Sequence, residues 1–473
     1  MSTARLYQRI ARQIAEQINQ GVYRPGDRLP GVRRLSRQFG VSVSTIVQAQ
    51  RCLEDEGRIQ ARPRSGYYVR ARPWPLPDPP DISRPTVRPV PVTGQALVLR
   101  LIQATNERDF VQLGAAVPDP RFLPVRPLQR TLSAAARNGG ERLATYQFPP
   151  GNPELRRQIA RRMADSGCRI PPDEIVVTSG CQEALILALR AVARPGDVIA
   201  IESPCFYVFL QAIESLGLQA LEIPTHPTTG ISLEALTLAL EQWPVKACAL
   251  TANFSNPLGY CMPAEKKQAL VALLARHGTP LIEDDIYGDL GFDGDRPPAV
   301  RAFDEEGSVI YCSSFAKTLS PGLGVGWIIP GRWREAVTFL KCVTNLATPT
   351  WPQFAIADFL RHGGYDHHLR QVREEYSRHV ALMIRAVGRY FPEGTRVTQP
   401  RGGFVIWVEL PQTVDAVTLC QEALQRRISI APGPIFSAAG KYAHFIRLNC
   451  AQIWNEKLEK ALLTVGRLAR EMT

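Results

Sequence analysis

A proline-rich segment near the N-terminus strongly restricts how this chain can fold. Eight prolines fall within residues 71–92. Proline fixes φ and has no backbone N–H, so such a segment forms neither a helix interior nor a central strand. The chain of 473 residues is long enough for two or three domains. We predict a semi-rigid, extended linker over residues 71–97 between domains at 1–70 and 98–473, and favour a spacer over a targeting or recognition segment.

The first 70 residues show the pattern of a small helical domain. The apolar spacing of residues 4–19 predicts an amphipathic helix. Its apolar positions are Leu6, Ile10, Ile14 and Ile18. Residues 32–39 fit a second helix closed by Gly40, and Ser42 can cap a third helix. The inner face of the third helix consists of Ile46, Ala49 and Leu53.

Two short strands are expected next, at residues 58–62 and 67–69, around a turn at 63–66. Three helices followed by a hairpin make a winged helix-turn-helix. The first 72 residues contain fourteen arginines, no lysine and five acidic residues, a net charge of +9, whereas the remaining 401 carry only +3. Dense positive charge on a small segment is typical of a surface that binds a polyanion. A basic surface that is merely solvated is the alternative.

From about residue 100, short apolar strands alternate with helices. The expected strands are 175–178, 198–201, 247–251, 280–282 and 309–311, with a helix at 182–193. This pattern favours a mostly parallel sheet covered on both faces. Beyond about residue 375 we expect a smaller α+β lobe. Its expected strands are 403–408, 428–430 and 445–449. The predicted fold class is therefore α/β: a winged helix-turn-helix, then a large α/β domain with a small C-terminal lobe.

The composition limits the compartment. No run of about 18 apolar residues is present, and residues 1–17 lack the apolar core of a signal peptide. The ten cysteines are scattered, without a Cys-x-x-Cys pair or a metal-like cluster with histidine. We expect a cytoplasmic protein with reduced thiols, no membrane contact and no metal.

Lys317 is the leading candidate for chemistry. It follows an apolar run, and Ser314 lies three residues before it. A pyridoxal 5'-phosphate enzyme holds its cofactor in this way: the lysine amine forms a Schiff base with the aldehyde, and the hydroxyl reaches the phosphate. A lone lysine is more often a solvated surface charge, so neighbouring motifs have to decide between the two interpretations.

Two further features would serve the phosphate and the ring of such a cofactor. Gly180, Cys181 and Gln182 lie at a strand-to-helix turn, where backbone N–H groups and the helix dipole favour a phosphate. Phe206 follows a strand and would stack on the pyridine ring. Taken singly, these are an ordinary turn and a core aromatic.

Polar residues after the next strands fit the substituents of the ring. Asn256 would hydrogen-bond to the ring oxygen, and Tyr287 would reach the same oxygen. Asp284 would pair with the pyridinium nitrogen at the carboxyl end of its strand. A capped turn and solvated acids are the ordinary interpretations. Because all these groups occur in the required order with Lys317 last, together they predict a pyridoxal phosphate site.

Residues from about 110 onward resemble the fold-type I (class I) aminotransferase family, and the segment around Lys317 is similar to its cofactor-lysine motif. The resemblance implies that Arg447 binds a substrate carboxylate as a bidentate fork; an arginine paired to an acid is the alternative. It also implies a homodimer in which Tyr146 reaches the phosphate of the neighbouring subunit. The family has a phosphate-clamping arginine seven residues after the lysine, where this chain has Gly324. This departure implies weaker cofactor binding or a substitute basic residue.

The N-terminal domain resembles the GntR-type winged helix in residues 23–35 and 40–45. The resemblance implies that Arg33 contacts DNA near the start of the second helix. The third helix would enter the major groove with its N-terminal end, and the wing tip would touch DNA as well. The other implied DNA-binding residues are Ser42, Ser44, Thr45, Gln48, Arg64 and Gly66. A winged helix used for protein contacts is the alternative.

The order of GntR-like head, proline-rich linker and aminotransferase-like body resembles the MocR subfamily of transcription regulators over nearly the whole chain. The resemblance implies a cytoplasmic, homodimeric regulator that binds double-stranded DNA and carries pyridoxal 5'-phosphate. Its effector would be an amine, an amino acid or pyridoxal phosphate itself. Two alternatives stay open: a genuine aminotransferase with an appended DNA-binding domain, or a DNA-binding repressor with a degenerate body free of pyridoxal phosphate. Weak transaminase activity is compatible with the regulator.

Overall fold

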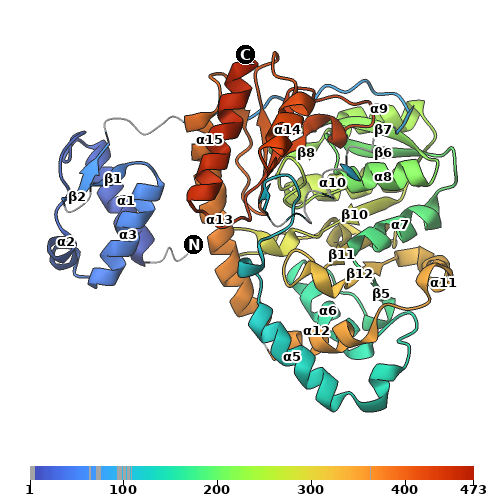
Figure 1. Ribbon diagram of the computed structural model, residues 1–473. Helices are drawn as coiled ribbons and strands as arrows, with labels where there is room; N and C mark the ends of the chain where they lie inside the picture. Colours follow the sequence, from blue (N-terminus) through green and yellow to red (C-terminus); the bar gives the residue numbers. More distant parts are fainter. Residues whose placement is uncertain are drawn as a thin grey trace. The chain divides into compact units, whose positions relative to one another are not determined.

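The structure is a computed structural model that describes residues 6–62, 65–70, 76–92, 98–99, 103, 107, 109–362 and 364–473. The chain divides into two compact units, which are Met1–Pro77 with Ala381–Arg389, and Asp78–Val380 with Tyr390–Thr473. We call the first unit the head and the second the body. Figure 1 labels their helices and strands.

The N-terminal part of the head contains three helices and a two-stranded hairpin, and residues 381–389 of the head belong to the long helix α13 (Gly364–Tyr390). The N-terminal elements are α1 (Leu6–Asn19), α2 (Val32–Phe39), α3 (Val43–Asp55), β1 (Ile59–Arg62) and β2 (Gly66–Val69). The predicted inner residues of α3 are fully buried. Local signals set the helix ends: Gly40 closes α2 with a left-handed φ of 64°, and the Ser42 hydroxyl accepts a 3.2 Å hydrogen bond from the Thr45 N–H. The predicted winged helix-turn-helix is therefore confirmed.

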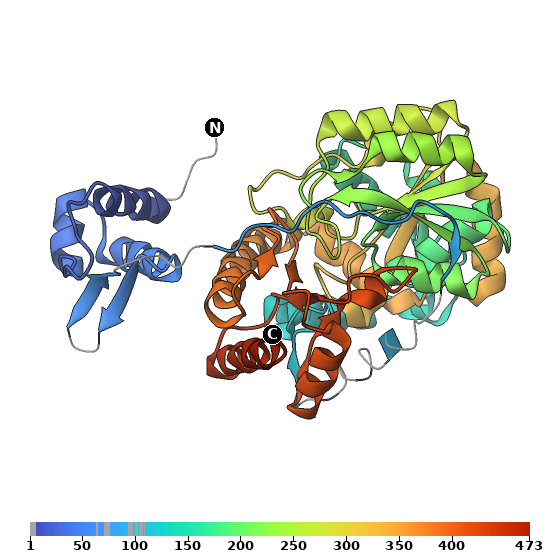
Figure 2. The ribbon, with the colours of Figure 1, turned by 90° about the horizontal axis from the view of Figure 1, so that it is seen from above.

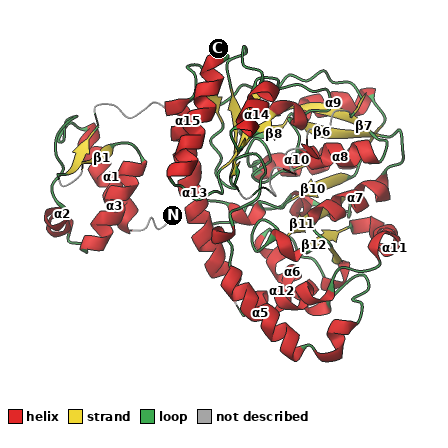
Figure 3. Ribbon diagram, viewed as in Figure 1, coloured by secondary structure: helices red, strands yellow, loops and turns green. Residues whose placement is uncertain are grey.

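A nine-stranded sheet forms the centre of the body, between helices (Figure 3). In spatial order its strands are β3 (Val90–Pro91), β7 (Gln219–His226), β6 (Val198–Ser203), β9 (Val245–Leu250), β10 (Leu281–Asp284), β11 (Val309–Ser314), β12 (Gly326–Ile329) and β5 (Val176–Thr178), with β8 (Gly230–Ile231) beside β7. From β7 to β11 neighbouring strands are parallel, whereas β12 is antiparallel to both β11 and β5. The sheet is mostly parallel, as predicted, but no predicted strand covers β12.

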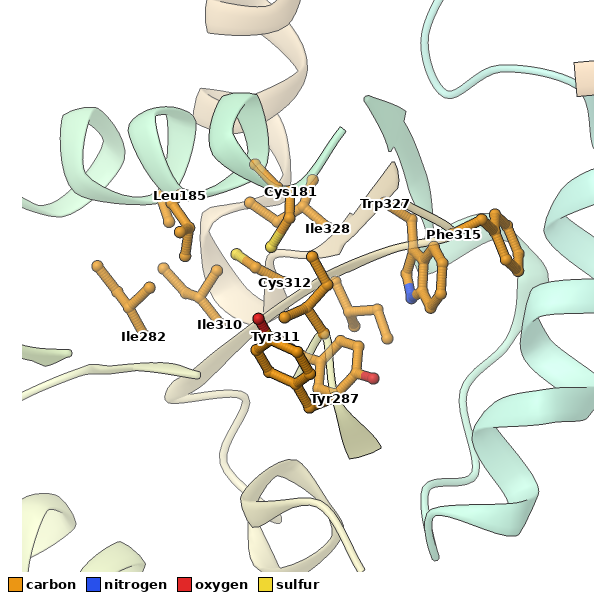
Figure 4. Packing of buried hydrophobic residues seen from close by; sticks show 14 of the residues in the cluster. Cys181, Leu185, Ile282, Tyr287, Ile310, Tyr311, Cys312, Phe315, Trp327 and Ile328 are labelled. Carbon is orange, nitrogen blue, oxygen red and sulfur yellow. The ribbon is translucent and has the colours of Figure 1, made fainter. Parts of the chain in front are cut away.

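Alternate side chains of the central strands pack on opposite faces of the sheet. Ile199 and Ile201 of β6 belong to one apolar cluster, and Val198 and Ala200 belong to another. The helices of the first cluster include α7 (Cys181–Val192) and α8 (Tyr207–Ser215), and those of the second include α9 (Leu233–Gln242) and α10 (Ala264–Arg276). Figure 4 shows part of the first cluster, where α7 packs on β10, β11 and β12. Burial on both faces explains why these strands are continuously apolar.

Two central strands run further than predicted. β10 reaches Asp284, which pairs with Cys312, and β11 reaches Ser314, which pairs with Gly326 of β12. Hydrogen bonds to neighbouring strands keep these residues in the sheet although they are not part of the apolar run. Asp284 and Ser314 therefore lie at the carboxyl edge of the sheet.

A four-stranded antiparallel sheet forms the C-terminal lobe of the body. Its order is β13 (Arg396–Val397), β14 (Val405–Glu409), β17 (Phe445–Asn449) and β16 (Ala431–Pro432). A separate strand, β15 (Ile428–Ser429), pairs in parallel with β4 (Val111–Gln112) from the start of the body. The other helices are α5 (Val125–Asn138), α6 (Pro153–Asp165), α11 (Arg334–Asn345), α12 (Thr350–Arg361), α13 (Gly364–Tyr390), α14 (Ala416–Gln425) and α15 (Glu456–Glu471). Within the described residues, no helix combines the length and apolarity needed to cross a membrane.

The proline-rich segment lies along the body from Asp78 onward (Figure 2). The Asp78 carbonyl accepts a 2.8 Å hydrogen bond from the Val397 N–H, and the Ser83 hydroxyl accepts one of 2.8 Å from the Thr225 N–H. Further on, β3 pairs with the outer edge of β7. This part of the segment is extended, as proline requires, and it is hydrogen-bonded to the body.

Candidate functional site

The carboxyl ends of four parallel strands carry the candidate cofactor residues. Phe206 follows β6, Asn256 follows β9, Asp284 ends β10 and Lys317 follows β11. Parallel strands share this edge, so residues from distant parts of the sequence meet there. A cavity of about 650 Å³ opens at the edge. Its wall includes Lys317, Asp284, Tyr287, Ser314, Phe206 and the turn of residues 179–182.

The amine of Lys317 is directed into the body. Its Nζ donates a 2.7 Å hydrogen bond to the backbone oxygen of Ala116. Burial and, to a smaller extent, the nearby Arg447 cation lower the pKa of Lys317 to about 8, while Asp284 opposes this effect. A substantial fraction of the amine is therefore neutral near physiological pH, in the form that attacks an aldehyde.

Asp284 is a buried carboxylate at the end of β10. Its Oδ1 accepts a 3.3 Å hydrogen bond from Sγ of Cys181 and a 3.1 Å bond from the Ile286 N–H. Burial raises the pKa of Asp284 to about 6, and the two hydrogen bonds oppose that rise. At neutral pH the group is still mostly ionised and can hold a proton on a ring nitrogen.

Two buried polar atoms of the predicted site form no hydrogen bond of normal geometry in the described part of the chain. They are Nδ2 of Asn256 and Oη of Tyr287. The other amide atom of Asn256, Oδ1, accepts a 3.1 Å hydrogen bond from Nη1 of Arg447. An unsatisfied buried donor costs about 1–3 kcal/mol, so such atoms indicate a missing ligand. Both groups are chemically suited to donate to the ring oxygen of a pyridoxal, the role that the sequence analysis predicts for them.

Arg447 is a fully buried cation on β17. It donates to Oδ1 of Asn256 and to the backbone oxygen of Gly114, and its Nε has no partner. Among the described acids none forms an ion pair with Arg447, which argues against the alternative of an acid-paired arginine. A buried guanidinium without a counter-ion suits an anionic ligand such as a carboxylate.

The turn before α7 has the backbone geometry of an anion cradle. Gly180 adopts a φ of 102°, a region that side chains rarely occupy. A Cβ atom on Gly326 would lie 2.6 Å from the carbonyl carbon of Gly180, so β12 passes the turn only because it has glycine there. Gly180, Cys181, Gln182 and Ser314 all line the cavity, as does Gly324.

The two remaining aromatic candidates differ in position. Phe206 lines the cavity, and its ring centroid lies 4.8 Å from that of Tyr207. Tyr146 is 65% exposed, pairs with Phe148 and is not part of the cavity wall. A single chain therefore brings Phe206, but not Tyr146, to Lys317.

Several contacts in the candidate site were not predicted from the sequence. The Cys181 thiol on Asp284 is one, since Cys181 was expected to contribute only its backbone N–H. Another is Glu183, which accepts a 2.5 Å hydrogen bond from the Ser179 N–H and is bound by Lys341 at 2.8 Å. An acid in the first turn of α7 is visible in the sequence, whereas its lysine partner on α11 is not.

In the head, the implied DNA-binding residues lie around the start of α3. Arg33, Ser44 and Gln48 are exposed. The Ser42 hydroxyl lies 2.8 Å from those of both Ser44 and Thr45. Gly66 opens β2 with a φ of 104°, and Arg64 lies outside the described residues.

Comparison with family models divides the chain in the same way as the fold. Residues 6–69 match bacterial regulatory proteins of the gntR family, and residues 110–465 match aminotransferase class I and II. The chain belongs to the GntR-type regulators that carry an aminotransferase domain. This combination is consistent with the MocR architecture that the sequence predicts.

Known relatives share the arrangement from end to end. The HTH-type transcriptional regulators YjiR and YdcR of Escherichia coli are 42% and 41% identical to this regulator; the matches cover 97% and 98% of this chain, and 98% and 99% of theirs. The body alone is similar to LysN, the α-aminoadipate aminotransferase of Thermus thermophilus, solved with N-(5'-phosphopyridoxyl)-L-leucine. That match has a TM-score of 0.74 and 26% identity over 80% of this chain and 95% of LysN.

Proposed function

We propose that this regulator controls transcription through pyridoxal 5'-phosphate held in its body. The head would bind double-stranded DNA, and the body would respond to an amine, an amino acid or pyridoxal phosphate itself. The main observation is the pair of unsatisfied donors on Asn256 and Tyr287, of which Tyr287 lines the cavity together with Lys317 and the ionised Asp284. We also propose a cytoplasmic location, which the DNA-binding head supports.

Each residue of the site has a role in this proposal. Lys317 would bind the aldehyde covalently, Asp284 would hold the proton on the ring nitrogen, Asn256 and Tyr287 would donate to the ring oxygen, Phe206 would cover a ring face, and Gly180, Cys181, Gln182 and Ser314 would face the phosphate. When bound, the cofactor supplies an electron sink and a reactive carbon for amines. The protein itself removes water from the Lys317 amine and keeps Asp284 ionised.

Arg447 supports the proposal that amino acids are among the possible effectors. Its guanidinium is buried without an acid partner, close enough to the Lys317 amine to lower the pKa of that amine. A ligand with an amine and a carboxylate could therefore engage both residues. Such a ligand changes DNA binding only if its affinity differs between two states of the regulator.

A second copy of the chain would complete the assembly. Tyr146 and Phe148 are 65% and 56% exposed, with ring centroids 5.5 Å apart. Exposed neighbouring aromatics favour a protein contact. We propose a homodimer in which Tyr146 reaches the phosphate of the neighbouring subunit.

DNA binding would use the positive head. Its helix α3 begins at an exposed cluster of hydroxyls, Ser42, Ser44 and Thr45, with Arg33 on the preceding helix. We assign Arg33 to the phosphate backbone, and Ser44 and Gln48 to base edges in the major groove. The wing with Arg64 and Gly66 would contact the adjacent backbone.

The same buried arginine favours a second candidate function, a genuine aminotransferase. Steady turnover of an amino acid with a 2-oxo acid would support it. The test of the leading proposal is the visible absorption spectrum of the protein with pyridoxal phosphate, measured beside Lys317→Ala. A band in the wild type that the variant lacks, together with a cofactor-dependent change in DNA affinity, is expected. Absence of the band at saturating cofactor would overturn the proposal and favour a DNA-binding protein with a degenerate body.

A further inference from the structure

The cavity around Lys317 is almost without positive charge at the end that would receive a phosphate. Among its described wall residues, Lys317 is the only lysine or arginine, and Asp284 is the only acid. The remaining polar groups at this end, those of Ser179, Gln182 and Ser314, are neutral. A phosphate ester would thus meet hydrogen-bond donors but no cation besides the covalently engaged lysine.

Gly324 accounts for part of this neutrality. It lines the cavity after the short helical turn Pro321–Leu323, with a left-handed φ of 58°. A Cβ atom built there meets no other atom within 4 Å, so the space for a larger side chain is open. No other described basic residue of the wall occupies that space.

Glu183 and Lys341 account for the rest of the missing positive charge. Glu183 accepts a 2.5 Å hydrogen bond from the Ser179 N–H, so a carboxylate already occupies one donor of the cradle. The buried Lys341 amine lies 2.8 and 3.0 Å from the two oxygens of Glu183 and 2.9 Å from Oγ1 of Thr348. Its charge is thereby matched by Glu183 and is not free for a second anion.

We propose that this pocket recognises the ring and aldehyde of its ligand and only weakly its phosphate, so that it also accepts unphosphorylated pyridoxal-type aldehydes. The inference rests on the proposed function, in which Lys317 holds a pyridoxal. The Lys317 nitrogen bonds to the aldehyde carbon, gives up its two protons, and the carbonyl oxygen leaves with them as water. This condensation needs neither the phosphate nor any further reactant.

Two ligands that differ only in the phosphate test the inference on the unmodified protein. Pyridoxal phosphate is compared with 5-deoxypyridoxal, which has a methyl group in place of the phosphate-bearing carbon and cannot close to an internal hemiacetal. Titration of the visible absorption band gives both dissociation constants. We expect values within about tenfold of each other, because a charge-assisted phosphate bond would be worth about ten- to a hundredfold. A preference of more than about tenfold for pyridoxal phosphate overturns the inference.

Position 324 supplies the matched variants. Gly324→Arg places a cation at the open space, and Gly324→Ala imposes the same backbone strain without charge. We expect the arginine variant to bind pyridoxal phosphate about ten- to a hundredfold more tightly than the alanine variant, with 5-deoxypyridoxal unchanged within about threefold. Equal tightening of both ligands, or of neither, contradicts the proposed role of the empty position. If either variant fails to fold, the comparison of ligands on the wild type still decides.

Failure of the proposed function gives a different result. Lys317→Ala and borohydride reduction followed by mass analysis of the wild type show whether either aldehyde is attached to Lys317. No attachment of either ligand overturns the cofactor site altogether. Attachment of pyridoxal phosphate alone keeps the site and removes only the inference about its phosphate end.

Discussion

Arg447 donates a hydrogen bond of 3.1 Å from Nη1 to Oδ1 of Asn256, and this bond decides which end of the amide remains available. With Oδ1 engaged, Nδ2 is the free donor beside Tyr287. Arg447, which belongs to the C-terminal lobe, therefore orients the amide of Asn256 at the edge of the large sheet. The Nε atom of Arg447 itself has no hydrogen-bond partner among the described residues. In the proposed function, this contact would couple recognition of the cofactor to recognition of a carboxylate.

Replacement of Arg447 by glutamine should weaken the binding of amino acids but not the binding of the corresponding amines. The variant loses the charged fork for a carboxylate, so we expect the affinity for an amino acid to fall about ten- to a hundredfold. The amine derived from that amino acid by loss of its carboxylate should bind within about threefold of wild type. Titrations of the cofactor absorption band with each ligand measure both values. A similar loss for both ligands would mean that Arg447 supports the site only through Asn256.

The rate of cofactor attachment should level off at an unusually low pH. Burial and the Arg447 cation lower the pKa of Lys317 to about 8 from an ordinary value of 10.5. The neutral amine is the nucleophile, so the rate should rise with pH up to about 8 and flatten above it. Stopped-flow absorbance after mixing cofactor-free protein with pyridoxal phosphate gives the profile. Free α-N-acetyl-lysine is the control, and a protein profile that keeps rising in parallel with it would refute the lowered pKa.

Asp284→Asn should stabilise the cofactor-free protein while it weakens cofactor binding. Burial raises the pKa of Asp284 from 3.8 to about 6, so the folded state binds its proton more tightly than the unfolded state does. Stability from this group is therefore present at low pH and is lost as pH rises from about 4 to about 6. At neutral pH the variant should gain about 1–3 kcal/mol in free energy of unfolding, and little near pH 4. Urea unfolding at both pH values tests this; a gain independent of pH would assign the effect to packing.

Arg33→Gln should weaken DNA binding through the phosphate backbone. The side chain is exposed on α2, so the fold of the head should be unaffected. We expect affinity to fall about equally for specific and unrelated DNA, with the salt dependence reduced by about one unit of slope. Fluorescence anisotropy over a range of salt concentrations measures both. Arg467→Gln on α15 of the body removes the same charge, and an equal effect there would show that only net charge matters.

The helices of the head illustrate what can be predicted from sequence. Helix α2 has the predicted bounds. Gly40 ends this helix in a left-handed backbone conformation, and that signal depends only on the local sequence. The start of α3 follows in the same way from the Ser42 cap. Strand β17 also matches its predicted bounds: four of its five residues are buried, and the apolar Phe445, Ile446 and Leu448 lie on either side of Arg447.

The sequence by itself therefore determined the order of domains, most of the secondary structure and the strand-end positions of Lys317, Asp284 and Asn256. These features depend on short-range signals: periodicity, caps and turns. Only the tertiary structure decided that Arg447 meets Asn256, that Cys181 bonds to Asp284 and that Lys341 neutralises Glu183. Such contacts join residues more than 100 positions apart, and they depend on strand register and close packing, which leave no local pattern in the chain.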